Sequence, residues 1–151
     1  MQRTELAYVA VPAQQPRATV AVLHAWWGLN DVISGICDDL AALGYVAVAP
    51  DLYRGQVAPT AEEAAALRAR KRSLPMWRQI VAVVQEARSD HGAAALGQVG
   101  LSMGGHWALW LAKQSRPEIP PISATTVFHA TRAARLAWQR TVGFLDRHLP
   151  A

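Results

Sequence analysis

Cysteine and metal-binding spacings are scarce in this sequence. It has one cysteine, Cys37, so an intrachain disulfide is excluded. Cys37 lies in an apolar helical stretch, which predicts a buried thiol of the core rather than a reactive one. The five histidines show no H-E-x-x-H spacing, and C-x-x-C is absent. The sequence therefore predicts neither a metal site nor a cofactor.

Long apolar runs are also missing. No run approaches the roughly 18 residues that a membrane-spanning helix needs. The first 17 residues, MQRTELAYVAVPAQQPR, are interrupted by charge and proline before any long apolar stretch, unlike a secretory leader. We therefore expect a soluble, cytoplasmic protein with no membrane partner.

Acidic residues are outnumbered by basic ones, and the formal net charge is +4. The arginines are spread along the chain and form no recognisable nucleic-acid-binding module. No G-x-G-x-x-G or Walker-type nucleotide loop follows the first predicted buried strand. The charge is interpreted as a solvated basic surface, and we expect no nucleic-acid partner.

Apolar residues are plentiful enough to build a core. They make up 52% of the 151 residues, which predicts a single domain over residues 1–151. Strand and helix patterns alternate along the chain, and this alternation is typical of an α/β protein. We expect a mostly parallel sheet flanked by helices on both faces.

The predicted elements follow from hydrophobic periodicity and from capping residues. Strands are predicted over residues 18–23, 45–49, 98–101 and 122–128, with an edge strand or hairpin over 6–11. Helices are predicted over residues 30–43, 60–72, 75–91 and 106–113, and from about 131 to 149. Asn30 and the T-A-E-E sequence from Thr60 to Glu63 are typical N-terminal caps, and Gly44 is typical of a helix end.

The most informative motif is VGLSMGG, residues 99–105. Gly100, Ser102 and Gly104 have the spacing G-x-S-x-G. In serine hydrolases this spacing turns a strand into a helix so sharply that the serine hydroxyl stands clear of the backbone. Side chains at the flanking positions would clash, so glycine is needed there. An apolar strand precedes the motif and a helical pattern follows it, which makes Ser102 the predicted nucleophile.

Two stretches resemble the dienelactone hydrolase family of α/β-hydrolases. They are LHAWWGLNDVISGICDDLAALGYVAVAPDLYRG, residues 23–55, and VGLSMGGHWALWLA, residues 99–112. The segment AWQRTVGFLDRHL, residues 137–149, resembles the family's closing helix. The resemblance implies an α/β-hydrolase-like fold and hydrolysis of carboxylic esters or lactones, with a small apolar ester or lactone as substrate.

The resemblance also implies roles for individual residues. Ser102 matches the position of the family's nucleophile, which is cysteine in the best-known members. The backbone N–H groups of Met103 and Trp26 would form the oxyanion hole. Ala25 stands where well-known members carry a glutamate that helps to control their cysteine, and losing both residues is consistent with serine chemistry. Three tryptophans either line an apolar pocket there or, for at least two of them, belong to the core: Trp26, Trp27 and Trp107.

The chain is short after its nucleophile motif. The family's acid and histidine follow the nucleophile at the ends of later strands. Only 49 of the 151 residues follow Ser102, and each further strand–helix–strand unit needs about 30 residues. The segment TTVFHATR, residues 125–132, runs directly into the closing helix. We interpret the chain as a truncated α/β-hydrolase-like fold that has lost an internal segment.

A serine nucleophile needs a base within hydrogen-bond reach for efficient turnover. His129 is the first candidate, because it follows the strand predicted to lie next to that of Ser102, and Glu118 or Asp51 would orient it. In the resemblance His129 replaces an aromatic residue and is not the family's catalytic histidine. His24, beside the proposed oxyanion hole, is the second candidate. Asp51 is more typical of a turn and capping residue than of a catalytic acid.

Two functions stay open from the sequence. The first is a serine hydrolase of esters or lactones that uses Ser102. The second is a catalytically incomplete member of the family that acts as a binding or self-associating module. Loss of the later strands would leave the strand over residues 122–128 as an exposed apolar edge, which favours a homo-oligomer through that edge.

Overall fold

A six-stranded sheet forms the centre of the computed structural model, which describes residues 2–3, 5–71, 73–93, 95–114, 117, 119–128 and 134–149. The strands are β1 (Gln2–Arg3), β2 (Ala7–Ala10), β3 (Thr19–Leu23), β4 (Val46–Pro50), β5 (Leu96–Leu101) and β6 (Ala124–Phe128). The helices are α1 (Asp31–Ala42), α2 (Ala61–Ala69), α3 (Ser73–His91), α4 (Met103–Ala112) and α5 (Ala134–His148).

The strand order is β1-β2-β4-β3-β5-β6. The neighbouring strands β4, β3, β5 and β6 are parallel to one another. At the edge of the sheet far from β6, β2 pairs antiparallel with β4 and β1 pairs antiparallel with β2. Every residue of β3 and β4 is buried, as is typical of parallel strands covered on both faces. The predicted mostly parallel sheet is confirmed. The stretch 6–11 contributes the single strand β2, which lies one strand in from the edge and forms a hairpin with β1.

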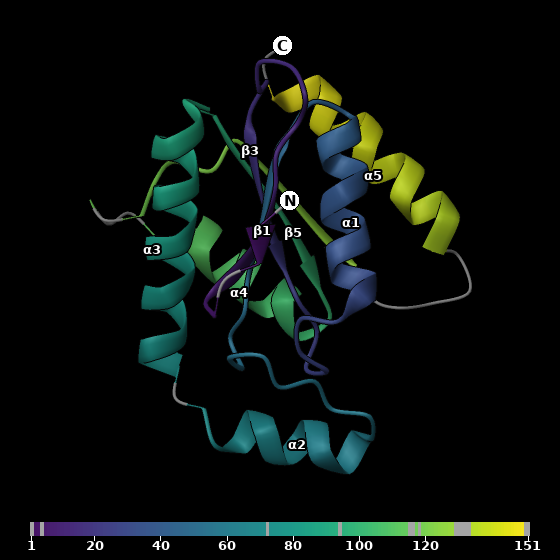
Figure 1. The fold of residues 1–151 in the computed structure, drawn as a ribbon, viewed down its shortest axis with the longest axis vertical. Helices are drawn as coiled ribbons and strands as arrows, with labels where there is room; N and C mark the ends of the chain where they lie inside the picture. The colour runs from purple at the N-terminus through teal and green to yellow at the C-terminus, as the bar shows by residue number, and fades with distance from the viewer. Residues whose placement is uncertain are drawn as a thin grey trace.

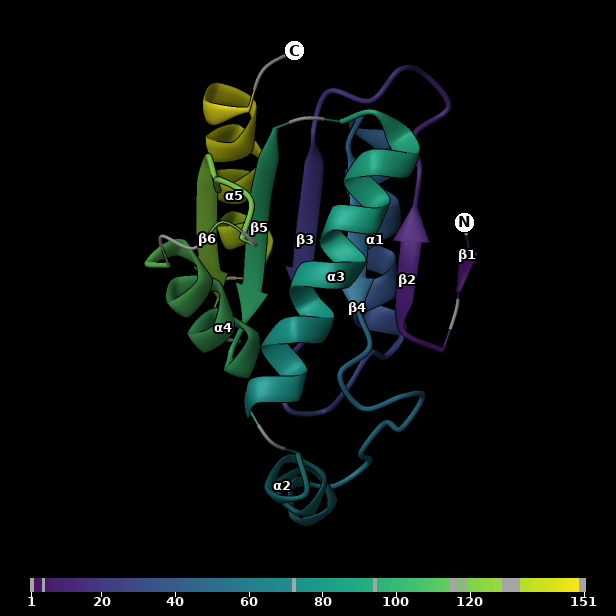
Figure 2. The ribbon, with the colours of Figure 1, turned by 90° about the vertical axis from the view of Figure 1, so that its left-hand side faces the viewer.

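Helices cover both faces of the sheet, as predicted. Figures 1 and 2 show α1 and α5 on one face and α3 and α4 on the other. Each pair of helices has its own buried cluster: Ile33, Cys37 and Leu145 lie in one, and Trp77 and Trp107 lie in the other. The helix α2 lies beyond the carboxyl ends of the parallel strands (Figure 2).

Local capping residues begin the helices where expected. Asn30 accepts a hydrogen bond from the backbone N–H of Ile33 at 3.3 Å, and Thr60 accepts one from Glu63 at 3.2 Å. The bounds of other elements differ from those predicted. The helix α2 ends at Ala69 rather than at residue 72, α4 begins at 103 rather than 106, and β6 begins at 124 rather than 122. The predicted start of the last helix at 131 lies outside the described residues.

The helix α5 is held against the sheet by apolar and polar contacts. Leu145 and Leu149 are buried, and a Cβ atom at Gly97 of β5 would lie 2.8 Å from Leu149 Cδ1. Tyr45 donates a hydrogen bond to Asp146 Oδ1 at 2.7 Å, and Arg17 pairs with the same oxygen at 2.9 Å. These contacts fix α5 on the sheet.

Two further expectations concern Cys37 and membrane helices. Cys37 is fully buried, as predicted, and burial raises the pKa of its thiol. Within the described part of the chain, every helix is too short or too polar to cross a membrane.

Candidate active site

Ser102 occupies a sharp turn between a strand and a helix. The strand β5 ends at Leu101, α4 begins at Met103, and Ser102 between them has φ +52° and ψ −110°. An L-residue rarely adopts a positive φ, and such a backbone costs of order 1–3 kcal/mol. The Ser102 side chain is exposed and does not cap α4. The turn therefore holds a free hydroxyl clear of the backbone, as the motif predicts.

Close packing explains why glycines flank this turn. A Cβ atom on Gly100 would lie 2.5 Å from the carbonyl oxygen of Gly104. A Cβ atom on Gly104 would collide with the carbonyl oxygen of Leu23, the last residue of β3. Because α4 begins this close to two strands, a side chain at either position would push the helix away from the sheet. The predicted need for glycine at both positions is confirmed.

Three parallel strands bring their carboxyl ends to one edge of the sheet. Leu23 of β3 is in register with Gly100 of β5, and Leu101 is in register with Phe128 of β6. The loop that follows β3 therefore begins beside the turn that holds Ser102. In α/β proteins such an edge is where binding and catalytic residues gather.

The loop after β3 carries Trp26 and is tightly folded. The carbonyl oxygen of Ala25 accepts hydrogen bonds from His24 Nδ1 at 2.6 Å and from the backbone N–H of Gly28 at 3.2 Å. This carbonyl shares a peptide unit with the N–H of Trp26, so the two bonds set the direction of that N–H. Met103 is the first residue of α4, where a backbone N–H has no acceptor within the helix.

His24 is a structural residue, and its candidacy as a catalytic base is wrong. Its imidazole is fully buried, its Nδ1–H donates to Ala25, and its Nε2 accepts a hydrogen bond from the backbone N–H of Leu52 at 3.2 Å. Burial lowers the pKa of His24, which keeps the ring neutral. Both nitrogens are occupied by backbone groups, so neither can take a proton from Ser102.

Asp51 is confirmed as a turn residue. Its Oδ1 accepts a hydrogen bond from the backbone N–H of Tyr53 at 3.0 Å, and its Oδ2 accepts one from Gly55 at 2.8 Å. Both carboxylate oxygens are thus engaged in the turn after β4, and among the described residues no histidine is hydrogen-bonded to Asp51. His129 and Glu118 lie outside the described residues, so the base and its partner stay predictions.

Two residues of this region were not singled out from the sequence. Tyr53 is fully buried, packs edge-on to His24 with 5.2 Å between ring centroids, and its hydroxyl donates to Met103 Sδ at 3.5 Å. Burial raises the pKa of Tyr53, so its hydroxyl stays protonated. The side chain of Gln98 donates hydrogen bonds to the carbonyl of Ala108 at 2.6 Å and to Thr125 Oγ1 at 2.9 Å.

The hydrogen bonds of Gln98 thus connect β5 to α4 and to β6. The hydrogen bond of Tyr53 connects the loop after β4 to the start of α4. A lone amide in an apolar strand was the signal for Gln98. Tyr53 lay in the PDLYRG segment of the family-like stretch but carried no signal of its own.

The three tryptophans divide between core and surface. Trp107 is 3% exposed and lies near Trp110, with 6.3 Å between ring centroids. Of the two alternatives left open for this residue, the core one is confirmed. Trp26 and Trp27 are half-buried and pack edge-to-face in the loop after β3. In the part of the chain that the structure describes, no group of three His, Cys, Asp or Glu residues is placed to hold a metal ion.

Comparison with known sequences identifies relatives of this chain. The sequence profile of the Dienelactone hydrolase family matches residues 6–141. A putative carboxymethylenebutenolidase of Aquifex aeolicus (strain VF5) is 35% identical over 114 residues, which cover 70% of this chain and 48% of the relative. A carboxymethylenebutenolidase of Pseudomonas putida is 28% identical over 116 residues, which cover 70% and 49%. The chain spans about half the length of these curated relatives.

Comparison with solved structures identifies the fold. The structure called m3DLH superposes with a TM-score of 0.62 and 21% identity, covering 94% of this chain and 71% of that chain. A putative dienelactone hydrolase from Klebsiella pneumoniae subsp. pneumoniae MGH 78578 superposes with a TM-score of 0.59 and 16% identity, covering 93% and 92%. The predicted truncated α/β-hydrolase-like fold is confirmed.

Proposed function

The chain belongs to the dienelactone hydrolase family, and we propose that it hydrolyses carboxylic esters or lactones with Ser102 as the nucleophile. The observation that carries this proposal is the exposed Ser102 hydroxyl on a backbone with φ +52°, between two glycines that admit no side chain. A turn this costly persists only where the surrounding structure imposes it. The proposed substrate is a small apolar ester or lactone, because half-buried Trp26 and Trp27 lie in the neighbouring loop.

The reaction has two stages. In the first, Ser102 Oγ attacks the carbonyl carbon while a base takes its proton, and the carbonyl oxygen becomes an oxyanion. Backbone N–H groups of Met103 and Trp26 donate hydrogen bonds to that oxyanion. The ester C–O bond then breaks, the leaving oxygen takes the proton, and an acyl-serine remains. In the second stage water, deprotonated by the same base, attacks the acyl group and releases the acid and the free serine.

The proposed oxyanion hole is supported by the rigidity of its two halves. The Trp26 peptide is held by the His24 and Gly28 hydrogen bonds to Ala25. Met103 is held by the Tyr53 hydroxyl, and it begins a helix whose dipole favours negative charge at its first turn. Donors that are fixed before the reaction cost no reorganisation when the oxyanion forms.

His129 is the proposed base. It directly follows β6, whose last residue Phe128 is in register with Leu101 beside Ser102. The carboxyl ends of β5 and β6 lie at the same edge of the sheet as the nucleophile, and this position of Phe128 supports the proposal. The proposed cytoplasmic location rests on the sequence alone.

Hydrolysis of p-nitrophenyl acetate and labelling by a fluorophosphonate probe test the proposal. We expect the purified chain to turn over the ester and to be labelled at Ser102. The variant Ser102→Ala is expected to lose both signals, whereas Ser123→Ala, which removes another exposed serine, keeps both. His129→Ala is expected to lower the rate about 100-fold or more if that histidine is the base. Unchanged hydrolysis by Ser102→Ala would disprove the proposal.

A second function is favoured by one observation. Among the described residues no carboxylate is hydrogen-bonded to a histidine. A catalytically incomplete member of the family that serves as a binding or self-associating module fits this observation. Absence of both ester turnover and probe labelling in the folded wild-type chain supports this second function.

A further inference from the structure

The outer side of β6 is an open sheet edge. Among the described residues β6 pairs with β5 alone and is last in the strand order. Ala95 accepts a hydrogen bond from Thr19 of β3, so the alternate residues Leu96 and Gln98 of β5 direct their backbone groups to β6. Because Gly97 is in register with Ala124, residues 124 and 126 pair with β5, and the backbone groups of Thr125 and Val127 point away from it. These unpaired donors and acceptors are a template for another strand.

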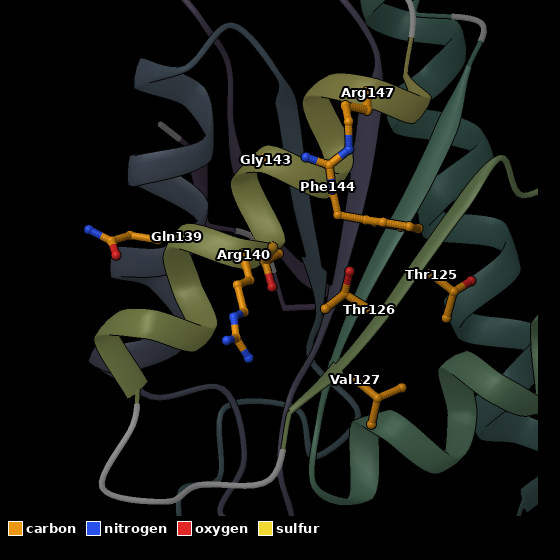
Figure 3. Close-up of a pocket in the computed structure, with 9 residues that line it drawn as sticks. Thr125, Thr126, Val127, Gln139, Arg140, Gly143, Phe144 and Arg147 are labelled. Atoms are coloured by element: carbon orange, nitrogen blue, oxygen red, sulfur yellow. The ribbon is translucent and has the colours of Figure 1, made fainter.

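A groove runs between this edge and α5. It has a volume of about 540 Å³. Its lining comes from β6 (Thr125, Thr126 and Val127) and from α5 (Gln139, Arg140, Thr141, Gly143, Phe144 and Arg147) (Figure 3). Thr125 bonds to Gln98 on the α4 face of the sheet, whereas Thr126 is in register with Val99 of the α5 cluster. Because side chains from both faces of β6 line it, the groove opens along the strand's edge.

The groove is cationic. Arg140 and Arg147 are exposed, and Figure 3 shows them along α5 with Gly143 between them, beside Thr126 on β6. Residues seven apart lie on one face of a helix. The lining contains no acidic residue. Within the described ranges the ion pair present joins Arg17 to Asp146, which leaves both groove arginines without a carboxylate partner.

A buried hydroxyl in the groove wall lacks a partner. Thr141 is 1% exposed, lines the groove, and its Oγ1 makes no hydrogen bond to any described residue. A buried polar atom without a partner costs free energy, and native structures contain few of them. This hydroxyl is therefore a third polar group, besides the two arginines, that a bound molecule would satisfy.

We propose that the β6 edge and the groove beside α5 bind an extended segment of another protein that carries acidic side chains. The segment adds to the sheet as a strand beside β6, using the outward backbone groups of Thr125 and Val127. Its acidic side chains point to the α5 face and pair with Arg140 and Arg147. The arginines are separated by about 10 Å along the helix, and strand residues rise about 3.3 Å each. Side chains on one face of a strand recur every second residue. Acidic residues two or four positions apart in the bound segment therefore match the separation of the two arginines.

Charge favours this occupant over a second copy of the chain. In an antiparallel β6–β6 dimer with a two-fold axis near Thr126, both α5 helices lie on the same face of the joined sheet. Arg140 and Arg147 of each copy then approach those of the other, and like charges across an interface oppose binding. The homo-oligomer expected from the sequence is accordingly the competing outcome of the test.

The test uses a fluorescein-labelled peptide, VEVETEVET, and a matched peptide with lysine in place of each glutamate. We expect the wild-type chain to raise the fluorescence anisotropy of the glutamate peptide only, with binding weakened by salt. Arg140→Glu/Arg147→Glu is expected to weaken binding at least tenfold. Arg70→Glu/Arg78→Glu makes the same charge change just after α2 and on α3 and is expected to leave binding intact. Equal binding of both peptides, or equal loss in both variants, overturns the proposal.

The backbone part of the proposal has its own readout. Thr125→Pro removes an outward N–H from an edge strand, where proline is tolerated, and is expected to abolish binding, whereas Thr125→Ser keeps it. If Thr125→Pro does not fold, amide hydrogen exchange replaces it: the peptide is expected to slow exchange at Thr125 and Val127. Unchanged exchange at these amides contradicts the proposal. So does sedimentation of the wild-type chain as a dimer that Arg140→Glu/Arg147→Glu leaves intact.

Discussion

The imidazole of His24 accepts a hydrogen bond at Nε2 from the backbone N–H of Leu52, 3.2 Å away. Through Nδ1 the same ring holds the Ala25 carbonyl, whose peptide unit carries the Trp26 N–H. One buried side chain therefore connects the loops after β3 and β4 and orients a proposed oxyanion donor. In this role His24 is a positioning residue, since it acts through the backbone of Trp26.

Removal of this imidazole is expected to impair the chemical step. His24→Ala frees the Ala25–Trp26 peptide to rotate, and loss of one oxyanion donor lowers kcat about 100-fold or more. The KM for p-nitrophenyl acetate is expected to change little, because the donor acts mainly in the transition state. His106→Ala, which removes an exposed histidine of α4, serves as the control. An unchanged kcat in folded His24→Ala would exclude the positioning role.

Burial of His24 also predicts acid-sensitive stability. The folded state holds the His24 pKa below its ordinary value of 6.5, so below that pH the unfolded state binds a proton that the folded state does not. Stability is therefore complete above pH 6.5 and falls as the pH drops below it. Urea unfolding at pH 8 and pH 5 measures this loss, and His24→Gln is expected to reduce the difference between the two midpoints. If the urea midpoints at pH 8 and pH 5 differ by the same amount in the wild-type chain and in His24→Gln, groups other than His24 cause the acid sensitivity.

The start of α4 tolerates no side chain at Gly104. Gly104→Ala would place a Cβ atom against the carbonyl oxygen of Leu23, so α4 must move away from β3. We expect a loss of about 3 kcal/mol or more in the free energy of unfolding, since strain in a packed core is that costly. Gly35→Ala in α1 is the matched control, because nothing lies within 4 Å of its added Cβ. The free energy of unfolding of Gly35→Ala is expected to rise by about 0.5–1 kcal/mol through helix propensity. Similar free energies of unfolding for the two variants would be inconsistent with the close packing at Gly104.

Ser102 combines backbone strain with the proposed nucleophile. Glycine adopts a positive φ without penalty, so Ser102→Gly is expected to raise the free energy of unfolding by about 1 kcal/mol while it abolishes esterase activity. Ser102→Ala keeps the strain and is expected to abolish activity with little change in stability. Urea unfolding of the three proteins separates the effects. Equal stability of the glycine and alanine variants would mean that the turn is unstrained.

The bond between Tyr45 and Asp146 predicts a loss of stability at alkaline pH. Burial and the hydrogen bond to Asp146 raise the pKa of Tyr45 from 10.0 to about 12. The folded state therefore keeps a proton that the unfolded state loses, and stability falls as the pH rises from 10 toward 12. Tyr45→Phe removes the titrating hydroxyl and is expected to flatten this part of the stability profile. Tyr8, bonded to Asp38, has a pKa raised similarly to about 12, so Tyr8→Phe is the companion variant.

Much of the fold was readable from short sequence patterns. The caps Asn30 and Thr60 each bond to a backbone group three residues away, so their role depends on local sequence alone. Helix ends were less certain. The base-rich end of α2 continues the helical pattern, yet the helix stops at Ala69 because only Ala64 of this helix is buried against the rest of the molecule.

The candidate site was only partly readable. The turn at Ser102 follows from adjacent glycines and an apolar strand, and it was predicted correctly. The roles of His24 and Tyr53 were not, and the sequence left two alternatives open for Trp107, because each depends on partners that the sequence does not place next to it. The Leu52 N–H that occupies His24 is 28 positions away, and the Met103 sulfur that meets the Tyr53 hydroxyl is 50 positions away.

Local sequence was thus sufficient for the alternation of strands and helices, for the glycines of the turn and for the family to which the chain belongs. These features depend on side-chain periodicity and on steric exclusion between near neighbours. Tertiary structure alone decided that His24 is occupied by backbone on both nitrogens and that two arginines of α5 lie beside the β6 edge. Hydrogen bonds and burial are properties of groups brought together by folding, so the chemical state of a histidine or a strand edge is specified only once the chain is folded.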